Sequence, residues 1–466
     1  MPVNVRMSNV VIRAACLLVA AALAALSPAT QASTEENRLA NGMRVVVKTD
    51  RRAPVVVVML WYKVGSVDEV NGVTGVAHVL EHMMFKGTES IKAGEFSRII
   101  SAAGGRENAF TSHDATGYFE TLQSSQLELA LKLEADRMNN LVLSPEEFTK
   151  EIKVVMEERR WRTEDRPRSL VFEALKATAL TAHPYRRPVI GWMSDLENMT
   201  VNDAADFYRR WYAPNNALLV VVGDVEPREV FALVEKYFGP IPARTLPVRK
   251  PQNEPVQRGA RRATVKAPAE LPYVVMAFRA PPLRDAERDW EPYALDMLAA
   301  VLDGNEAARL NRTLVRGERV ANSVGASYDG IARGPGLFYL IAIPTRGRSA
   351  AEVESALRRE MAKIIEEGVT EEELNRVKAQ AIAAQVYQRD SMSFQAQQIG
   401  SLEMAGIPHN TIDVQLKKLR EVTPEQVREV ARKYFRDEAL TIVQLAPQPL
   451  STRRPVAPPA GVRHGR

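Results

Sequence analysis

Apolar residues along this chain follow two patterns, which predict short strands and long amphipathic helices. Valine-rich stretches at 45–48 and 55–64 and the continuous apolar run 217–222 are typical of strands. Segment 144–160 opens with a serine suited to an N-cap, continues with proline and has acids in its first turn, so it predicts a long helix. Because each half of the chain mixes strands with helices, we predict the α+β fold class.

The pattern of elements is repeated. Thr200 opens a segment that leads through aromatic residues into the apolar strand starting at Ala217. Thr423 opens a similar segment that leads into the strand starting at Leu440, and each threonine precedes its strand by the same distance. This spacing predicts an internal repeat, and therefore two related α+β domains.

The length of the chain agrees with two domains. About 410 residues remain between a leader and a tail, which exceeds one ordinary domain. The helix-opening sequence SPEEF at 144–148 is also echoed by TEEEL at 370–374. A proline-rich, charged stretch between the repeats is typical of a linker. We predict a signal peptide at 1–32, an N-terminal domain at 33–245, a linker at 246–262, a C-terminal domain at 263–446, and a disordered tail at 447–466 rich in proline and arginine.

The leader predicts export. Two arginines precede an apolar run at 14–26, and small residues at 30–32 suit cleavage by a signal peptidase. The apolar run is short for a membrane span, and no other stretch predicts one, so we expect no transmembrane span in the mature chain. Cys16, the only cysteine, lies in the leader, so the mature protein would contain no disulfide. We expect a periplasmic protein.

Charge argues against a nucleic-acid partner. The formal net charge is +5, but two arginines lie in the leader and four in the tail. Without those six arginines the folded body has a charge near −1 (5 − 6). A nearly neutral body with basic ends does not resemble a nucleic-acid-binding surface.

The sequence HVLEH at 78–82 carries the most specific chemistry. On a helix, His78 and His82 project side by side and can reach one metal ion, and Glu81 lies on the same face. This H-x-x-E-H order is the inverzincin motif, although two surface histidines on an amphipathic helix would give the same pattern. A catalytic zinc ion takes three protein ligands, and Glu151 and Glu158 share one face of the predicted helix at 144–160. On spacing alone, acids in such a helix more often form a solvated face than bind a metal.

Four segments together resemble one known family. Residues 75–88 (GVAHVLEHMMFKGT) resemble the zinc-helix signature of the pitrilysin/insulinase family of metallopeptidases. The acids at 151–158 resemble the family's downstream element at the family's spacing. Residues 104–112, followed by 116–118, resemble its edge strand, and 183–191 also fit. The resemblance extends over nearly the whole chain after the leader and is closest to short members such as bacterial processing peptidases and the mitochondrial processing peptidase.

The resemblance implies a role for each candidate residue. His78, His82 and Glu158 would be the ligands of one Zn²⁺ per chain. Glu81 would be the general base, and Glu151 an acid that orients one of the histidines through a hydrogen bond. The implied reaction is zinc-dependent hydrolysis of peptide bonds in unfolded peptides or small proteins. The implied architecture is half of a clamshell-type peptidase chamber.

The second half lacks this chemistry. At the positions equivalent to Glu151 and Glu158 it has Val377 and Ala384, so we expect an inactive related domain. In the family this domain supplies an arginine and a tyrosine to the substrate. Arg316 matches the arginine, but the tyrosine position falls at Asn322 or Ser323. Nearby, Tyr328 is either a substitute or a core residue.

The resemblance also implies partners. Peptides would bind by strand addition along Asn108, Ala109 and Phe110, with Asn108 holding the peptide backbone. A closed chamber needs four such domains, so a second subunit of the same family is expected. Because the substrate tyrosine is missing here, a heterodimer is favoured over a homodimer. The alternatives to a zinc endopeptidase are a non-catalytic assembly subunit and a zinc-binding subunit that is inert without its partner.

Overall fold

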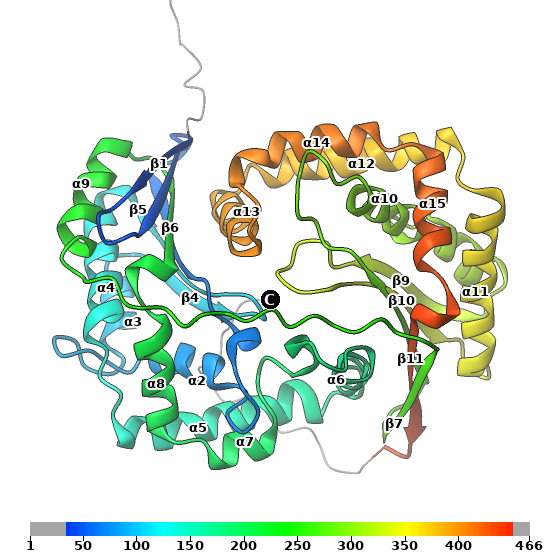
Figure 1. Ribbon diagram of the computed structural model, residues 1–466, viewed down its shortest axis with the longest axis horizontal. Coiled ribbons are helices and arrows are strands. Elements are labelled where there is room, and N and C mark those ends of the chain that lie inside the picture. Colours follow the sequence, from blue (N-terminus) through cyan, green and yellow to red (C-terminus); the bar gives the residue numbers. More distant parts are fainter. Residues whose placement is uncertain (1–33, 451–466) are drawn as a thin grey trace, which may run out of the picture.

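The computed structural model of this protein describes residues 34–450. The predicted signal peptide, with Cys16, and the end of the predicted tail at 451–466 lie outside the described residues. Two halves of similar architecture lie side by side, and each contains one sheet (Figure 1). No helix among residues 34–450 has both the length and the apolar character needed to cross a membrane.

The sheet of the N-terminal half has the strand order β1-β2-β6-β3-β5-β4. Only β2 and β6 pair in parallel, and β4 forms one edge of the sheet. The strands are β1 (Thr34–Arg38), β2 (Arg44–Thr49), β3 (Val55–Tyr62), β4 (Arg106–Thr111), β5 (Thr116–Gln123) and β6 (Ala217–Gly223). Its helices are α2 (Val76–Met83), α3 (Glu95–Ala102), α4 (Leu127–Asn140), α5 (Pro145–Arg159), α6 (Pro167–Ala179), α7 (Met193–Asn198), α8 (Val201–Trp211) and α9 (Pro227–Phe238).

The sheet of the C-terminal half has the order β7-β11-β8-β10-β9. Its strands are β7 (Arg261–Pro268), β8 (Tyr273–Ala280), β9 (Ala321–Tyr328), β10 (Gly336–Pro344) and β11 (Leu440–Gln448). Its helices are α10 (Glu291–Asp303), α11 (Ala350–Glu367), α12 (Glu371–Gln388), α13 (Met392–Ala405), α14 (Ile412–Glu421) and α15 (Pro424–Tyr434). A segment without helix or strand, 246–260, connects the halves and crosses between them in Figure 1.

The two sheets confirm the predicted repeat and fold class. Setting β1 aside, the strands of both sheets follow in the same order along the chain and in space, and β11 pairs with β7 in parallel as β6 does with β2. The capping chemistry also repeats. Thr200 and Thr423 both form capping boxes, at the starts of α8 and α15, which is the local reason that these helices begin where they do.

Each half covers one face of the other half's sheet with a helix. Helix α6 of the N-terminal half packs on the C-terminal sheet, where Val171 and Leu175 join a buried cluster with strand residues such as Val275. Helix α13 of the C-terminal half packs on the N-terminal sheet, where Ala396 and Ile399 join a corresponding cluster. The exchanged helices give each half an apolar core that the other half completes.

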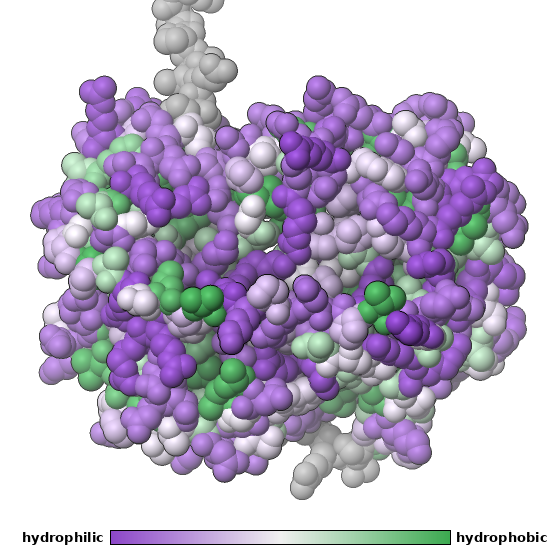
Figure 2. Space-filling model, viewed as in Figure 1, coloured by the Kyte–Doolittle hydropathy of each residue, from purple (hydrophilic) through white to green (hydrophobic). Residues whose placement is uncertain are grey.

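The face in Figure 2 shows mainly hydrophilic side chains, with hydrophobic residues in small separate groups. The larger apolar clusters are internal. One lies between the N-terminal sheet and helices such as α2, α4 and α8, and the other between the C-terminal sheet and helices such as α10, α11 and α15. Helix α2 therefore lies inside the N-terminal core.

Candidate metal centre

The helix that carries the H-x-x-E-H sequence is fully buried. All eight residues of α2 are buried, which is unusual for a helix with two histidines and a glutamate. The helix begins after Gly75, which has φ +89° and whose backbone lies against residues 190–191. A side chain there would be strained by its dihedral and would lie 2.6 Å from the carbonyl oxygen of Ile190. A glycine at position 75 lets the start of α2 sit deep in the fold.

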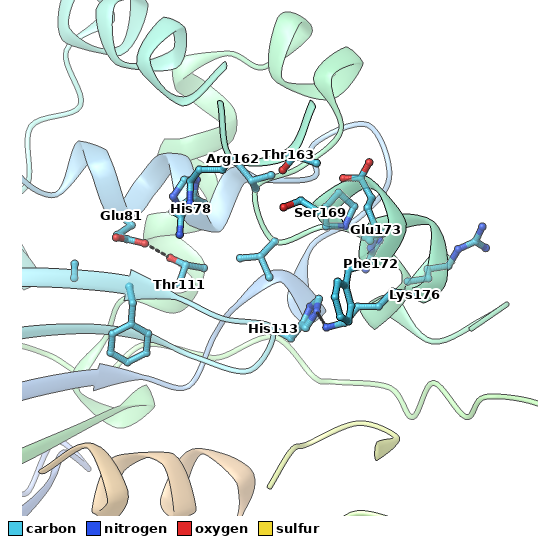
Figure 3. Close-up of a pocket in the computed structure, with 17 residues that line it drawn as sticks. His78, Glu81, Thr111, His113, Arg162, Thr163, Ser169, Phe172, Glu173 and Lys176 are labelled. Carbon is cyan, nitrogen blue, oxygen red and sulfur yellow. Dashed lines mark hydrogen bonds between the residues drawn. The ribbon is translucent and has the colours of Figure 1, made fainter. Parts of the chain in front are cut away.

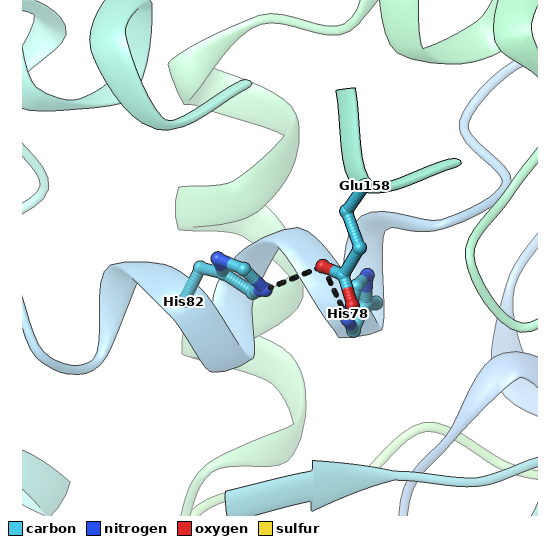
Figure 4. Close-up of side chains that lie close together, drawn as sticks. All are labelled: His78, His82 and Glu158. Carbon is cyan, nitrogen blue, oxygen red and sulfur yellow. Dashed lines mark ion pairs between the residues drawn. The ribbon is translucent and has the colours of Figure 1, made fainter. Parts of the chain in front are cut away.

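Helix α2 meets α5 at a cluster of three possible metal ligands, His78, His82 and Glu158 (Figure 4). The Glu158 carboxylate oxygen Oε2 lies 3.3 Å from Nε2 of His82 and 3.7 Å from Nε2 of His78. All three ligand atoms lie within 4.8 Å of one another. Donors held by one tetrahedral zinc ion stand about 3.3–3.5 Å apart, so this arrangement fits such an ion. Two imidazoles and one carboxylate are also a known donor set for catalytic zinc.

The side chains around the cluster fix its orientation. Oε1 of Glu151 lies 2.9 Å from Nδ1 of His82, so it orients the ring whose other nitrogen faces Glu158. The second oxygen of Glu151 pairs with Lys86 at 2.5 Å. Arg162 donates to Oε1 of Glu158 at 2.5 Å, which leaves Oε2 facing the histidines. Glu151 is buried, and so the solvated helix face that spacing alone allowed is not formed by this residue.

The electrostatics of the cluster favour a bound cation. Burial opposes a charged imidazole at His82, but its hydrogen bonds with Glu151 and Glu158 outweigh burial and raise its pKa to about 9. Burial opposes the Glu158 carboxylate, but the hydrogen bond with His82 and the charge of His78 lower its pKa below the ordinary value. Two carboxylates beside His82 thus attract positive charge, which a proton or a metal ion can supply.

Glu81 lies next to the cluster on the wall of a cavity (Figure 3). The hydroxyl of Thr111, the last residue of β4, donates to Oε2 of Glu81 at 2.6 Å. Burial raises the pKa of Glu81 to about 7, although His82 and the Thr111 hydrogen bond act against the rise. A carboxylate with a pKa near neutrality is suited to proton transfer. The cavity has a volume of about 360 Å³ and is also lined by His78.

The predicted substrate-binding residues lie in two places. Asn108, Ala109 and Phe110 are on edge strand β4, and Ala109 and Phe110 line the cavity beside His78 and Glu81. Arg316 is exposed in the π-helical turn η6 (Asn311–Gly317), donates to the carbonyl oxygen of Glu306, and does not line this cavity.

Tyr328 is partly buried at the end of β9. Its ring packs on Phe338 and its hydroxyl donates to the carbonyl oxygen of Pro281. It also lines a second cavity between the halves, of about 560 Å³, which shares Phe110 with the cavity beside the metal cluster.

Three residues that orient the site were not singled out from the sequence. Thr111 holds Glu81, Arg162 holds Glu158, and Lys86 holds Glu151. Lys86 and Thr111 both lie in segments that resemble the family's motifs, so a signal for them was present. Arg162 lies in the π-helical turn η3 (Arg160–Glu164) after α5, and nothing in the pattern of residues marks that turn.

Both halves of the chain match models of one protein family. Residues 44–192 match the family described as "Insulinase (Peptidase family M16)", and residues 198–381 match "Peptidase M16 inactive domain". Over 422 residues the chain is 34% identical to "Zinc protease PqqE" of Helicobacter pylori, which covers 89% of this chain and 93% of that protein. The chain belongs to peptidase family M16. The resemblance to the insulinase family is therefore confirmed.

Solved M16 structures share the fold. A protease from Helicobacter pylori has a TM-score of 0.85 and 31% identity, over 90% of this chain and all of that one. The periplasmic protease PqqL from Escherichia coli has a TM-score of 0.76 over 91% of this chain but only 49% of its own. At 21% identity, PqqL shows a shared fold alone. The M16 fold thus occurs both in chains of this length and in chains about twice as long.

Proposed function

We propose that this M16 protein is a zinc-dependent endopeptidase that hydrolyses peptide bonds in unfolded peptides or small proteins. The observation that carries the proposal is the buried cluster of His78, His82 and Glu158, with Glu81 beside it on the wall of the cavity next to β4. The zinc-protease name of the Helicobacter pylori relative supports the choice of metal and of reaction.

His78, His82 and Glu158 would hold one zinc ion, and Glu151 would keep His82 in the orientation that binding requires. A zinc ion held by this donor set supplies Lewis-acid chemistry, which activates water and polarises a carbonyl group. Arg162 would keep Oε1 of Glu158 engaged, so that Oε2 remains the ligand atom.

Glu81 is the proposed general base. Its carboxylate would accept a proton from the attacking water and deliver it to the leaving amine as the peptide bond breaks. The hydrogen bond from Thr111 fixes one carboxylate oxygen and leaves the other for proton transfer. Because Thr111 ends strand β4, the base and the strand proposed to bind peptide are held in one arrangement.

Peptide binding is proposed along β4. Because this strand forms the edge of its sheet within the described residues, an extended peptide can add to it through backbone hydrogen bonds. Ala109 and Phe110 would contact the peptide beside the metal cluster, and Asn108 would hold its backbone. Strand addition selects unfolded substrates, because a folded protein presents few free strands of sufficient length.

We propose that the working enzyme contains a second M16 subunit, in a heterodimer or, as the alternative, a homodimer. Arg316 lies outside the cavity, and the hydroxyl of Tyr328 is bonded to Pro281. Both observations support a partner subunit that supplies the arginine and the tyrosine that contact the substrate. They also favour a second candidate function, a zinc-binding subunit that is active only with its partner. We also propose a periplasmic location, on the basis of the leader at 1–32.

Metal content and a quenched-peptide assay test these functions together. The endopeptidase predicts about one zinc per chain and cleavage by the purified protein. Zinc without cleavage until a second M16 subunit is added would support the partner-dependent function, and the absence of zinc binding would overturn both. Glu81→Gln is expected to keep zinc and to lower turnover roughly 10²–10⁴-fold. Glu89→Gln, a change of an exposed glutamate eight positions after Glu81, is the matched control.

A further inference from the structure

The connection between β9 and β10 reaches from the C-terminal half into the N-terminal half. We call residues 329–335 the latch. Arg333 of the latch donates through Nη1 to Oδ2 of Asp68 at 3.1 Å and to the carbonyl oxygen of Asp114 at 3.1 Å. Its backbone N–H donates to Oδ2 of Asp114 at 2.9 Å. One residue of the half without metal ligands thus contacts two segments of the half that has them.

The latch is held firmly on both sides. Within its own half, Arg284 donates to the carbonyl oxygens of three consecutive latch residues, 332–334. On the other side, the N–H of Gly334 donates to the hydroxyl of Tyr185 at 2.8 Å. A side chain at position 334 would lie 2.4 Å from the ring of His183, so the latch packs against the N-terminal half too closely for any residue but glycine. The contact is a fitted interface.

The first segment that Arg333 contacts leads to the metal helix. Asp68 ends the short helix η1 (Ser66–Asp68), its side chain is buried, and it also accepts a hydrogen bond from Arg249 of the connecting segment at 2.6 Å. The next residue, Glu69, is buried and accepts hydrogen bonds from the backbone N–H groups of Gly75 and Ala77 at 2.9 Å each. These groups lie at the start of α2, so Asp68 and Glu69 connect the latch to the helix that carries His78 and Glu81.

The second segment leads to the general base. Asp114 lies in the turn between β4 and β5, three residues after Thr111, whose hydroxyl holds Glu81. The two segments also contact each other, because the N–H of Ser66 donates to the carbonyl oxygen of Ser112 and its hydroxyl lies 2.7 Å from Nδ1 of His113. Arg333 therefore joins two supports of Glu81, one through α2 and one through β4.

We propose that Arg333 is a positioning residue for the peptidase reaction, and that the C-terminal half acts through the latch to hold Glu81 and the start of α2 in their working arrangement. The proposal rests on the proposed function for its catalytic consequence, but not for its structural one. The positive charge of Arg333 faces Asp68 and Asp114 across the interface, and Arg249 alone would remain beside Asp68 if that charge were removed. Without Arg333, both supports of Glu81 are expected to loosen.

The latch also lines the cavity between the halves, through residues such as Ile331 and Pro335. A latch that only forms a wall of the substrate cleft would change KM when altered, because binding alone would suffer. A latch that positions the base would lower kcat with little change in KM. The division of the effect between kcat and KM therefore separates the two roles.

Arg333→Met and Arg333→Lys in the full chain test the proposal, with Arg262→Met as the matched control, since Arg262 pairs only with Glu354 inside the C-terminal half. Hydrogen–deuterium exchange should become faster in peptides spanning 64–80 and 109–116 in Arg333→Met. In Arg333→Lys the exchange rates of these peptides should lie between those of Arg333→Met and the wild type, and in the control they should be unchanged. In the presence of zinc, kcat should fall roughly 10–100-fold in Arg333→Met with KM within about threefold, since small misplacements of a catalytic group have effects of this size.

Asp68→Asn removes the same contact from the other side and covers the case that Arg333→Met fails to fold. In the double variant Asp68→Asn with Arg333→Met, the loss in log kcat should be smaller than the sum of the losses in the two single variants, because both single changes break the same pair. Unchanged exchange at 64–80 in both single variants, or an effect confined to KM, would overturn the proposal. If the wild-type chain binds zinc but cleaves no peptide under any condition, the proposed function fails, while the exchange measurements still decide whether the latch holds α2.

Discussion

The two halves of this protein share a strand order but differ in what their helices carry. In the N-terminal half, α2 and α5 bring two histidines and a glutamate within metal-binding distance. In the C-terminal half, α12 has Val377 and Ala384 where α5 has Glu151 and Glu158, and α10 contains no histidine. The same backbone arrangement therefore brings three possible metal ligands together in one half, whereas the two equivalent positions of α12 hold a buried valine and an exposed alanine. Chemistry depends on a few side chains placed on the fold.

The hairpin tips of the two halves differ in a second way. The turn between β4 and β5 is short, residues 112–115, whereas the equivalent connection between β9 and β10 is the longer latch, residues 329–335. The longer tip extends across the interface and contacts the shorter one through Arg333 and Asp114. The C-terminal half thus contacts the turn that follows β4, the strand whose last residue holds Glu81.

The largest expected effect comes from the ligand position itself. Glu158→Ala should weaken zinc binding by more than roughly 100-fold, since even residues that only orient a ligand account for about 10–100-fold. Ala384→Glu places a carboxylate at the equivalent position of α12 and should create no zinc site, because α10 offers no histidines. Metal analysis after dialysis measures both. Zinc retained by Glu158→Ala would show that the two halves do not differ in the way described.

The exchanged helices should be of similar importance to both halves. Leu175→Ala in α6 and Ile399→Ala in α13 each remove a buried side chain that packs on the other half's sheet. Each should lower the free energy of unfolding by about 2–5 kcal/mol. Val248→Ala, at a residue 88% exposed in the connecting segment, should change it by less than about 0.5 kcal/mol. Denaturant unfolding measures these changes. A lower free energy of unfolding in only one of the two helix variants would show that the two helices are not of similar importance.

A smaller effect should separate two acids of α5. Glu151→Gln removes the carboxylate that holds His82 and should weaken zinc binding about 10–100-fold. Glu157→Gln, on the exposed side of the same helix, should leave zinc affinity unchanged. Titration against a competing chelator gives both values. Equal affinities for the two variants would contradict the role given to Glu151.

The smallest effect concerns the connecting segment and depends on pH. Burial opposes the Glu254 carboxylate, but hydrogen bonds from the backbone of Thr181, His183 and Ala182 outweigh burial and lower its pKa from 4.5 to about 2. A lowered pKa means that the carboxylate stabilises the fold above pH 4.5, and that this stabilisation is lost as pH falls toward 2. Glu254→Gln should therefore lower the melting temperature at pH 7 and have less effect at pH 3. The exposed Glu270→Gln serves as a control, and a difference independent of pH would contradict this account.

Much of the site was accessible from local patterns. The spacing of His78, Glu81 and His82 predicts one helical face, and Ser144 followed by proline predicts the start of α5, as observed. The repeat of threonine caps and apolar strands predicts two related halves. Long-range contacts were not accessible in this way. Arg162 and Arg333 look like ordinary surface arginines in the sequence, and only the fold brings each to a carboxylate.

The sequence by itself determined the residue types of the candidate metal ligands, the helices that carry them and the two related halves, because these follow from short-range spacing and repeated local chemistry. Membership in family M16 rests on the match of long segments to known proteins. Only the tertiary structure decided that α6 and α13 are exchanged between the halves, that Thr111 holds Glu81, and that the latch reaches Asp68 and Asp114. The physical reason is that these contacts join residues far apart in the chain. Their energies depend on burial and on geometry that exist only after the two sheets have packed.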